Sequence, residues 1–398
     1  MERAIQVQLL NFITDNKILS TNQSGFRRNH STETTVVFLV DNILERMDKR
    51  QFTGSVFIDL KKVFDVVNHN YLLYKLEHYG VRNDSLDWFR NYLTTRTQTV
   101  NFGNVLSTSS NVDYSVPQGS ILGPLLFILF INDLPQCLEN CSISMYADDT
   151  VIYYSAAILK SVQTVVQDDM DKIALWMVDN ELLLNESKTK TLLFGTRQKL
   201  GEGADFDINI NINGTKLEQV YSFKYLGMTL DYQLNWKEQV ESVSMKISNR
   251  LKLLSRIRSC LTPAAAKCVY NGLIQPIFYY CDVTWSKVSE GCSHELQRLQ
   301  NKAARTILQL TRTGDSLNIL NWMNLENRRA MHVCILVFKC MNALVPDYLN
   351  NYFSQNKNIP NYNTRLKTDL YLPTRKRNIR YNGTYQFNNL PADLKTIN

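Results

Sequence analysis

The sequence of 398 residues has no CxxC pair, no internal repeat and no apolar run long enough to cross a bilayer. Histidine lies within two residues of a cysteine at only two places, and neither spacing suits a zinc site. The longest apolar stretch, 121–131, is interrupted by Gly123 and Pro124. These absences argue against a zinc-stabilised or membrane-embedded protein. No signal peptide is recognisable, so we expect the eight cysteines to be reduced, buried thiols of an intracellular protein of the nucleus or cytoplasm.

The formal net charge of +7 conceals an acidic front and a basic rear. Residues 1–230 contain 21 Lys/Arg and 26 Asp/Glu, a net charge of −5, whereas residues 231–398 contain 23 and 11, a net charge of +12. This division favours a catalytic unit followed by a polyanion-binding unit, and uneven surface charge is the alternative. Apolar residues at 44% and charged residues at 20% exclude wholesale disorder.

Hydrophobic periodicity predicts a mixed order of helices and strands. Helices are expected at 3–19, 31–50, 71–79, 85–92, 125–134 (closed by Pro135) and 160–180. Strands are expected at 56–60 after a break at Gly54-Ser55, at 97–102, and around a hairpin turn at Asn213-Gly214. From Trp236 onward the pattern is helical, and from about Pro346 we expect loops with weak structure.

Two adjacent carboxylates, Asp148 and Asp149, stand at the tip of a predicted β-hairpin. Residues 142–147 alternate polar and apolar, and residues 150–154 are β-branched and aromatic, as expected for the two strands. Asp tolerates the backbone angles of a tight turn, which explains one aspartate but not two side by side. Because neighbouring carboxylates repel unless a cation lies between them, we interpret the pair as ligands of a hard divalent metal. A solvated turn is the alternative.

A third carboxylate, Asp59, lies in the apolar segment 56–60. A buried unpaired aspartate is unfavourable, so Asp59 should have a partner, and capping of the next turn is the alternative. One strand aspartate and a hairpin pair supply oxygen ligands for two Mg²⁺ ions. In such a site one metal lowers the pKa of a primer 3′-hydroxyl and the other holds a triphosphate, which stabilises in-line attack and pyrophosphate departure.

Seven short blocks follow one another along the chain and together carry a family resemblance. They are Gln23-Ser24-Gly25-Phe26-Arg27 with His30-Ser31-Thr32; Phe57-Ile58-Asp59-Leu60 with Phe64-Asp65 and His69; Val116-Pro117-Gln118-Gly119-Ser120 with Leu122-Gly123-Pro124-Leu125; Ile131-Asn132-Asp133-Leu134; Tyr146-Ala147-Asp148-Asp149-Thr150; Leu184-Asn185 with Lys188-Thr189-Lys190; and Tyr225-Leu226-Gly227. In this order they resemble the reverse transcriptase region of non-LTR (LINE-type, jockey-like) retrotransposons. The resemblance covers about residues 9–236, and a weaker similarity continues to the end.

The resemblance implies an α/β (α+β) polymerase right-hand fold, in which fingers and palm with an antiparallel catalytic sheet precede a helical thumb and a basic tail. The implied regions are 1–230 for fingers and palm, 231–330 for the thumb-like region and 331–398 for the basic C-terminal region. The implied activity is that of an RNA-directed DNA polymerase, with RNA template, DNA primer and dNTPs as partners and no membrane. Two Mg²⁺ ions, with Mn²⁺ as a substitute, would be its cofactors, and an element-encoded RNA-binding protein a further partner.

The same resemblance assigns roles to the acidic residues and to one aromatic residue. Asp59, Asp148 and Asp149 match the family's catalytic metal ligands, and the Leu60 carbonyl would add an oxygen. Phe64 falls where the family has the bulky residue that stacks against the sugar and excludes a 2′-hydroxyl. Without the resemblance, core packing is the better interpretation of Phe64.

Further matching positions concern the nucleotide and the primer. Gln118 matches the residue that touches the incoming nucleotide and Gly119 allows close backbone approach, although the segment is otherwise a turn. Arg27 is interpreted as a triphosphate contact, with a solvated arginine as the alternative. Lys188 or Lys190 matches the lysine that protonates the leaving pyrophosphate, and we place Lys188 in the site; a strand-edge lysine is the alternative for both. Tyr225 and Gly227 belong to the hairpin that holds the primer end.

Basic residues in the rear half accompany apolar helical stripes, as in a thumb that meets phosphates. They are Lys246, Arg250, Lys252, Arg256 and Arg258, then Arg298, Lys302 and Arg305. A solvated helix face is the alternative. In the tail, Arg375-Lys376-Arg377 and Arg380 with Tyr371, Tyr381 and Tyr385 are a hypothetical contact with single-stranded RNA.

The chain also departs from the family pattern. Only 22 residues precede Gln23, so we expect N-terminally truncated fingers and no upstream endonuclease within this sequence. Val63 replaces the usual small residue before Phe64. The principal alternative is therefore a catalytically inactive retroelement remnant that at most binds nucleic acid. A maturase-like intron reverse transcriptase is a third interpretation. It is disfavoured by Thr150 at the end of the 146–150 block and by the 131–134 block, both of which resemble LINE-type sequences.

Overall fold

A computed structural model describes residues 1–94, 96–201, 206–310, 316–355, 369–373 and 378–395. The chain divides into two compact units that are interleaved along the sequence. The first comprises 1–30, 51–193 and 200–220, and the second comprises 31–50, 194–199 and 221–398. No helix in the described part of the chain is both long and apolar enough to cross a membrane.

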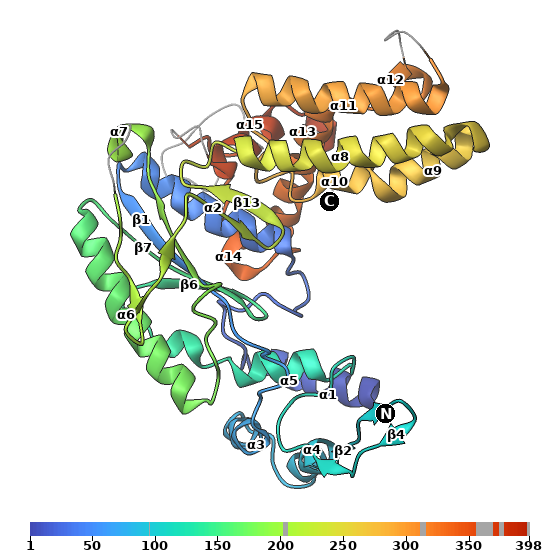
Figure 1. The fold of residues 1–398 in the computed structure, drawn as a ribbon. Helices are drawn as coiled ribbons and strands as arrows, with labels where there is room; N and C mark the ends of the chain where they lie inside the picture. The colour runs from blue at the N-terminus through green and yellow to red at the C-terminus, as the bar shows by residue number, and fades with distance from the viewer. Residues whose placement is uncertain (95, 202–205, 311–315, 356–368, 374–377, 396–398) are drawn as a thin grey trace. The chain divides into compact units, whose positions relative to one another are not determined.

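The centre of the first unit is a five-stranded sheet in the order β11-β8-β1-β7-β6 (Figure 1). Its strands are β1 (Phe52–Ile58), β6 (Ser142–Tyr146), β7 (Asp149–Ala156), β8 (Lys190–Phe194) and β11 (Glu218–Gln219). β7 pairs antiparallel with both β1 and β6, whereas β11 and β8 pair parallel. The antiparallel sheet expected from the sequence is therefore present around the Asp148–Asp149 hairpin.

Helix α6 (Leu159–Asp179) packs against β1 and β7 and so covers one face of this sheet (Figure 1). Its buried apolar residues recur every three or four positions, which gives one apolar face. Gly54 lies under this helix, because a Cβ built on it would come 2.5 Å from Val162 Cγ1. The predicted break at Gly54-Ser55 is wrong: both residues lie inside β1, where the close helix requires a glycine.

The remaining elements of the first unit are short helices and small hairpins. They are α1 (Glu2–Asp15), α3 (His69–His78), α4 (Asp84–Thr94), α5 (Gly123–Phe130), η1 (Leu134–Cys137), and the pairs β2 (Thr97–Gln98) with β5 (Ser110–Asn111), β3 (Asn101–Phe102) with β4 (Val105–Leu106), and β9 (Asn211–Ile212) with β10 (Thr215–Lys216). The single strand expected at 97–102 is thus divided between two hairpins. The helix expected to end at Pro135 ends at Phe130, and Pro135 belongs to a separate 3₁₀ turn.

The second unit is mostly helical. It contains α2 (Thr32–Asp48), the hairpin β12 (Ser222–Tyr225) and β13 (Met228–Asp231), α8 (Lys237–Ile257), η2 (Arg258–Cys260), α9 (Pro263–Leu273), α10 (Gln275–Tyr279), α11 (Glu290–Leu308), α12 (Ser316–Ile319), α13 (Leu325–Met341), α14 (Asp347–Asn350), α15 (Ile379–Asn388) and α16 (Ala392–Lys395), while the short α7 (Arg197–Leu200) lies at a boundary between the units. Helices α8 and α11 each bury one apolar face, and Leu310, which follows the end of α11, is exposed.

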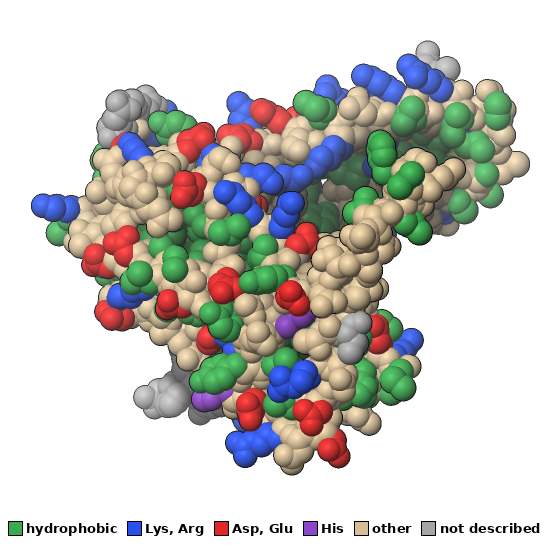
Figure 2. Space-filling view, turned by 60° about the horizontal axis from the view of Figure 1, so that its bottom comes forward, with side chains coloured by type: hydrophobic (Ala, Val, Ile, Leu, Met, Phe, Trp, Pro, Cys, Tyr) green, Lys and Arg blue, Asp and Glu red, His purple; other side chains and the backbone are tan. Residues whose placement is uncertain are grey.

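Most of the basic residues predicted on α8 and α11 are exposed, and Figure 2 shows Lys and Arg side chains (blue) gathered in the upper part of that view. Arg258 is an exception, because only 7% of it is exposed. Its Nε and Nη2 donate to the Ile307 carbonyl at 2.8 and 2.6 Å, close to the C-terminus of α11. The prediction that Arg258 meets phosphates is therefore wrong, since its guanidinium satisfies carbonyls at a helix end.

The described part of the C-terminal region contains helices where the sequence predicted loops. Helix α15 packs against α13, and Ile379 joins a buried cluster with Val333, Leu336 and Cys340 of α13. Gly383 permits this packing, because a Cβ there would come 2.7 Å from the Phe353 ring. Because polar and aromatic side chains interrupt the apolar spacing of this segment, hydrophobic periodicity does not predict its helix. The proposed RNA-binding triplet 375–377 lies outside the described residues.

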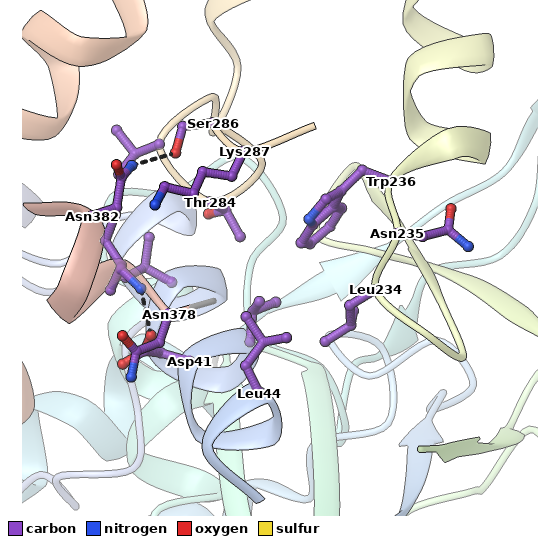
Figure 3. Close-up of a pocket in the computed structure, with 14 residues that line it drawn as sticks. Asp41, Leu44, Leu234, Asn235, Trp236, Thr284, Ser286, Lys287, Asn378 and Asn382 are labelled. Atoms are coloured by element: carbon purple, nitrogen blue, oxygen red, sulfur yellow. Dashed lines mark hydrogen bonds between the residues drawn. The ribbon is translucent and has the colours of Figure 1, made fainter. Parts of the chain in front are cut away.

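A cavity of about 210 Å³ lies in the second unit beside the contact between α2 and the start of α15 (Figure 3). Asp41 Oδ1 accepts a hydrogen bond from the Ile379 N–H at 2.8 Å, and Arg380 Nε lies 3.2 Å from Asp41 Oδ2. On the same side of the cavity Asn382 Nδ2 donates to Ser286 Oγ at 3.0 Å (Figure 3). These polar groups bind one another, so they fasten α15 to α2. Arg380 is thereby paired with Asp41 and Glu45, and its contact with RNA stays a prediction.

Asp41 makes the stability of this contact depend on pH. Burial raises the pKa of Asp41 from its usual 3.8 to about 6, against the opposing effects of Ile379 N–H and Arg380. Because the folded pKa of Asp41 lies above the unfolded one, the contribution of Asp41 to stability is greatest in acid and falls as pH rises from about 4 through 6. The fall amounts to about 2–3 kcal/mol. We expect Asp41→Asn to remove most of it in denaturant unfolding followed between pH 4 and 8.

The exposed variant Glu238→Gln is the control, because it also removes one carboxylate of the second unit. It should keep the wild-type pH dependence. An unchanged pH dependence in Asp41→Asn would contradict the assignment of this titration to Asp41.

All eight cysteines are free thiols. Cys281 and Cys340 are buried as predicted, but Cys260 and Cys268 are exposed. Cys268 lies on α9, whose buried residues are Ala266 and Tyr270, so it belongs to the outer face of that helix. The expectation of uniformly buried thiols is wrong for these two positions.

Candidate active site

Three aspartates meet at one end of the central sheet because of strand register. Ile58, the last residue of β1, pairs with Thr150 of β7, so the next step of the register sets Asp59 opposite Asp149. On the other side of β7, Tyr146 pairs with Asp149, and Ala147 and Asp148 form the two-residue turn between them. The hairpin predicted from the sequence is confirmed, with Asp148 in the turn and Asp149 at the first position of the return strand.

The electrostatics of these carboxylates differ from those of a solvated turn. Desolvation, together with the charges of Asp148 and Asp59, raises the pKa of Asp149 to about 6. Burial also raises the pKa of Asp148, with a backbone hydrogen bond opposing the rise and the charge of Asp59 adding to it. The three acidic groups therefore lie within electrostatic range of one another, where a cation would relieve their repulsion.

Asp59 has the partner that the sequence argument required. Asn185 Nδ2 donates to Asp59 Oδ2 at 2.7 Å, and the Asn185 N–H donates to the Asp59 carbonyl at 2.8 Å. Thr189 Oγ1 accepts from the Asp59 N–H at 3.2 Å. Leu60 continues this contact through an isolated bridge to Leu184. The 184–190 block thus holds Asp59 and leaves the second carboxylate oxygen without a hydrogen bond in the described part of the chain.

The donor chemistry fits a hard divalent cation, because all three groups offer carboxylate oxygens. As they are placed, however, no group of three or more His, Cys, Asp or Glu among the described residues forms a metal-ligand cluster. The site therefore has the residues for a metal but not its closed geometry.

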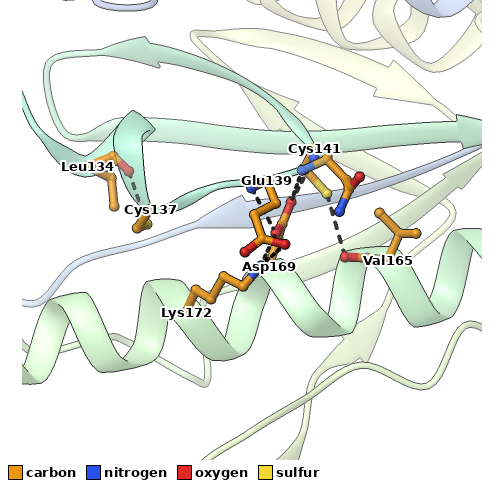
Figure 4. Close-up of polar contacts among 8 residues, drawn as sticks. Leu134, Cys137, Glu139, Cys141, Val165, Asp169 and Lys172 are labelled. Atoms are coloured by element: carbon orange, nitrogen blue, oxygen red, sulfur yellow. Dashed lines mark hydrogen bonds and ion pairs between the residues drawn. The ribbon is translucent and has the colours of Figure 1, made fainter.

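Asp169, for which the sequence predicted no role, supports the start of the Asp148–Asp149 hairpin. Its fully buried carboxylate on α6 accepts hydrogen bonds from the N–H groups of Glu139, Asn140 and Cys141 at 2.6–3.1 Å (Figure 4). Lys172 Nζ lies 3.3 Å from the same carboxylate. Burial alone would raise the pKa of Asp169, but these partners lower it overall. The loop that leads into β6 is thus tied to α6.

Comparison with known proteins agrees with this geometry. Residues 1–230 match the family described as reverse transcriptase (RNA-dependent DNA polymerase). This match spans more than half of the chain. The chain belongs to the reverse transcriptase family. The resemblance to non-LTR retrotransposon reverse transcriptases deduced from the seven blocks is confirmed, as is the polymerase fold class.

Three similar proteins come from mobile elements of Drosophila melanogaster. The probable RNA-directed DNA polymerase from transposon BS is 31% identical over 324 residues, that from transposon X-element 27% over 314, and the RNA-directed DNA polymerase from mobile element jockey 26% over 317. In each case the alignment covers 77% of this chain and 34% of the relative. This reverse transcriptase chain therefore spans about a third of the length of the relatives that it matches.

Solved telomerase structures are more distant. Telomerase from Candida albicans in complex with a fragment of telomeric RNA is 12% identical, with a TM-score of 0.45 over 81% of this chain and 58% of the telomerase. Apo telomerase from Candida tropicalis truncated from its C-terminal domain is 13% identical, with a TM-score of 0.42 over 58% of this chain and 44% of the telomerase. Such low scores carry no conclusion about function.

In the reverse transcriptase chain, Phe64 and Gln118 lie in neighbouring segments of the first unit. The Val116 N–H donates to the Phe64 carbonyl at 2.9 Å, and Gln118 Nε2 donates to Asp65 Oδ1 at 2.6 Å. The half-buried Phe64 ring packs against Phe127 with 4.8 Å between centroids. Gly119 has a φ of +77°, and a Cβ there would meet nothing within 4 Å. Backbone conformation, rather than crowding within the protein, requires this glycine.

The candidate basic residues differ in how firmly they are held. Arg27 Nη1 donates to the carbonyls of Ser20 and Gln23 at 2.7 and 2.9 Å, so Arg27 braces its own loop. Lys190 Nζ is bound to Glu218 Oε2 and to the Ser187 carbonyl, both at 2.6 Å. Lys188 is exposed, and its ammonium forms no ion pair with the described residues. Of the two lysines, Lys188 is thus the one whose ammonium is not held by a carboxylate.

Tyr225 and Gly227 lie in the second unit, at the β12–β13 turn. Leu226 and Gly227 have φ values of +44° and +81°, which fits a tight two-residue hairpin turn. Tyr280 holds this turn, because its hydroxyl donates to the Leu226 carbonyl at 2.6 Å. A Cβ on Gly227 would lie 3.1 Å from the Tyr280 ring, so glycine also permits this contact. The turn is predicted from the sequence, whereas its contact with Tyr280, about fifty residues away, is not.

Proposed function

We propose that this chain is the polymerase region of a non-LTR retrotransposon reverse transcriptase. It would add deoxynucleotides to a primer 3′-hydroxyl with RNA as template. The partners would be an RNA template, a DNA primer and dNTPs, with an element-encoded RNA-binding protein as a further candidate. The observation that carries the proposal is the strand register, which sets Asp59 opposite Asp149 and beside the Asp148 turn.

The three aspartates would act as ligands for two Mg²⁺ ions, or for Mn²⁺ in their place. When bound, these ions supply Lewis-acid activation of the 3′-hydroxyl and stabilise the charge that develops on the phosphates. Asn185, whose Nδ2 donates to Asp59 Oδ2, would restrain the Asp59 carboxylate. Phe64 would exclude a 2′-hydroxyl, Gln118 and Arg27 would contact the nucleotide, and Tyr225 and Gly227 would hold the primer end.

A primer-extension assay tests this function. The whole chain is given a primed RNA template, Mg²⁺ and dNTPs, beside the same mixture with EDTA and a double variant Asp148→Ala/Asp149→Ala. The proposal is supported if the wild type extends the primer in Mg²⁺ and neither the EDTA sample nor the double variant does. Failure of all samples to extend, with primer-template binding retained, supports the inactive nucleic-acid-binding remnant instead.

We expect Lys188→Ala to lower the extension rate by about a hundredfold, the lower end of the effect of a positioned general acid. Lys188 would protonate the departing pyrophosphate, whereas Lys190 is paired with Glu218. Lys190→Ala is the matched control and should lower the rate much less. Single-turnover rates at saturating dNTP measure both, and equal losses in the two variants would contradict the assignment of this role to Lys188.

A further inference from the structure

The side chain of Gln23 is fully buried and makes three hydrogen bonds beside the Asp148 turn. Its Oε1 accepts from the N–H groups of Gly25 at 2.7 Å and Ala147 at 2.9 Å. Its Nε2 donates to the Ala147 carbonyl at 3.3 Å. One amide therefore binds both polar backbone groups of Ala147, the residue directly before Asp148.

Ala147 needs this support because it has a φ of +54°, in the left-handed region. A residue with a Cβ in this region is strained by roughly 1–2 kcal/mol. The strained backbone at Ala147 sets the direction in which the chain enters Asp148. Paired hydrogen bonds to its N–H and carbonyl oppose rotation of both flanking peptides, so they fix the turn from outside the hairpin.

The backbone around Gln23 reinforces the contact. The Ser24 N–H donates to the Met145 carbonyl at 2.8 Å, and the Met145 N–H donates to the Asn22 carbonyl at 2.9 Å. Gly25 then passes so close to the turn that a Cβ on it would come 2.4 Å from the Ala147 nitrogen. Residues 22–25 thus form an additional parallel partner for the end of β6.

We propose that Gln23, with Gly25 making room for it, is a positioning residue for the carboxylate of Asp148. Gln23 acts through Ala147: its amide holds the left-handed turn and so keeps Asp148 aimed toward Asp59 and Asp149. The link to catalysis rests on the proposed function, whereas the link to the turn rests on the hydrogen bonds alone.

The chain offers a matched control in Gln167 of α6. Gln167 Oε1 accepts from the Asn211 N–H at 2.7 Å and its Nε2 donates to the Asn211 carbonyl at 2.8 Å. Gln23 and Gln167 therefore make the same pair of bonds, to Ala147 and to Asn211. Gln167→Ala removes the same pair of backbone bonds at the β9–β10 hairpin, although Gln167 is more exposed and its Nε2 also donates to Asp171 Oδ1.

The experiment compares Gln23→Ala with Gln167→Ala by hydrogen exchange of backbone amides and by primer extension at varied Mg²⁺ and dNTP. In Gln23→Ala, the exchange rate of the Ala147 amide should rise at least about tenfold while that of the Asn211 amide stays unchanged. In Gln167→Ala, the Asn211 amide should exchange faster and the Ala147 amide should not. The Mg²⁺ concentration for half-maximal extension should rise about 10- to 100-fold in Gln23→Ala, the effect of losing a residue that orients a metal ligand. It should stay at the wild-type value in Gln167→Ala.

Gln23→Glu tests the same contact if Gln23→Ala fails to fold. A protonated glutamic acid at position 23 can still accept from the Gly25 and Ala147 N–H groups and donate to the Ala147 carbonyl. An ionised one cannot donate, and its negative charge repels the Ala147 carbonyl oxygen. Extension by Gln23→Glu relative to wild type should therefore fall as pH rises. Wild-type exchange at Ala147 in Gln23→Ala, or a wild-type Mg²⁺ requirement, would overturn the proposal. If the wild type extends no primer, the proposed function fails, and the exchange comparison still decides whether Gln23 holds the turn.

Discussion

Asp149→Asn is expected to lower primer extension by roughly a thousandfold or more and to leave the protein folded. Loss of a carboxylate that holds a catalytic metal removes several kcal/mol of transition-state stabilisation. The fold, by contrast, gains from the change, because burial and the neighbouring charges of Asp148 and Asp59 already raise the pKa of Asp149 to about 6. A neutral amide removes that unfavourable charge.

The measurement pairs an extension assay with thermal unfolding of the same preparations. The thermal midpoint of Asp149→Asn should equal or exceed that of the wild type at pH 8, where the native carboxylate is ionised. Asp113→Asn, a change at an exposed position of the first unit, is the control and should keep both activity and midpoint. A variant that loses its fold together with its activity would contradict the view that Asp149 serves chemistry at the expense of stability.

Asp169→Ala is expected to give the largest loss of stability, about 3–5 kcal/mol in the free energy of unfolding. The variant leaves three backbone N–H groups of the 139–141 loop without their acceptor and removes a partner of Lys172. Denaturant unfolding at pH 7 measures the loss. Asp168→Ala, the adjacent exposed position on the same helix, should change stability very little.

The pH dependence gives Asp169→Ala a second signature. Because its partners lower the pKa of Asp169 in the folded state, its contribution is present above the unfolded value of 3.8 and is lost as pH falls through the lower folded value. The difference between wild type and variant should therefore shrink below pH 4. A difference that stays constant down to pH 2 would show that lost packing, not the carboxylate, explains the effect.

Local patterns predicted the catalytic hairpin well. Alternation along 142–147 reports a strand with one buried face, and a two-residue turn between such strands depends mainly on adjacent residues. The same holds for the Asn213-Gly214 turn, where both residues have positive φ. The order of the seven blocks added the family, because each block has its own short signature.

Local patterns failed where distant segments decide the structure. Gly54 lies inside a strand on which α6 packs closely. The helix α15 is stabilised by its contacts with α2 and α13. Arg258 looked like a phosphate contact but binds the end of α11. Asn185, Gln23 and Asp169 form hydrogen bonds with partners that are about 30 to 125 residues away. No periodicity within a helix or strand records such contacts.

The two adjacent aspartates, their hairpin and the family to which they belong can be deduced from residue order, since period-2 alternation and short motifs are local properties. The meeting of Asp59 with Asp149, and the clamp that Gln23 places on the turn before Asp148, exist only in the folded chain. Strand register and buried hydrogen bonds join residues about 90 to 125 positions apart, and their pairing depends on how the whole sheet packs.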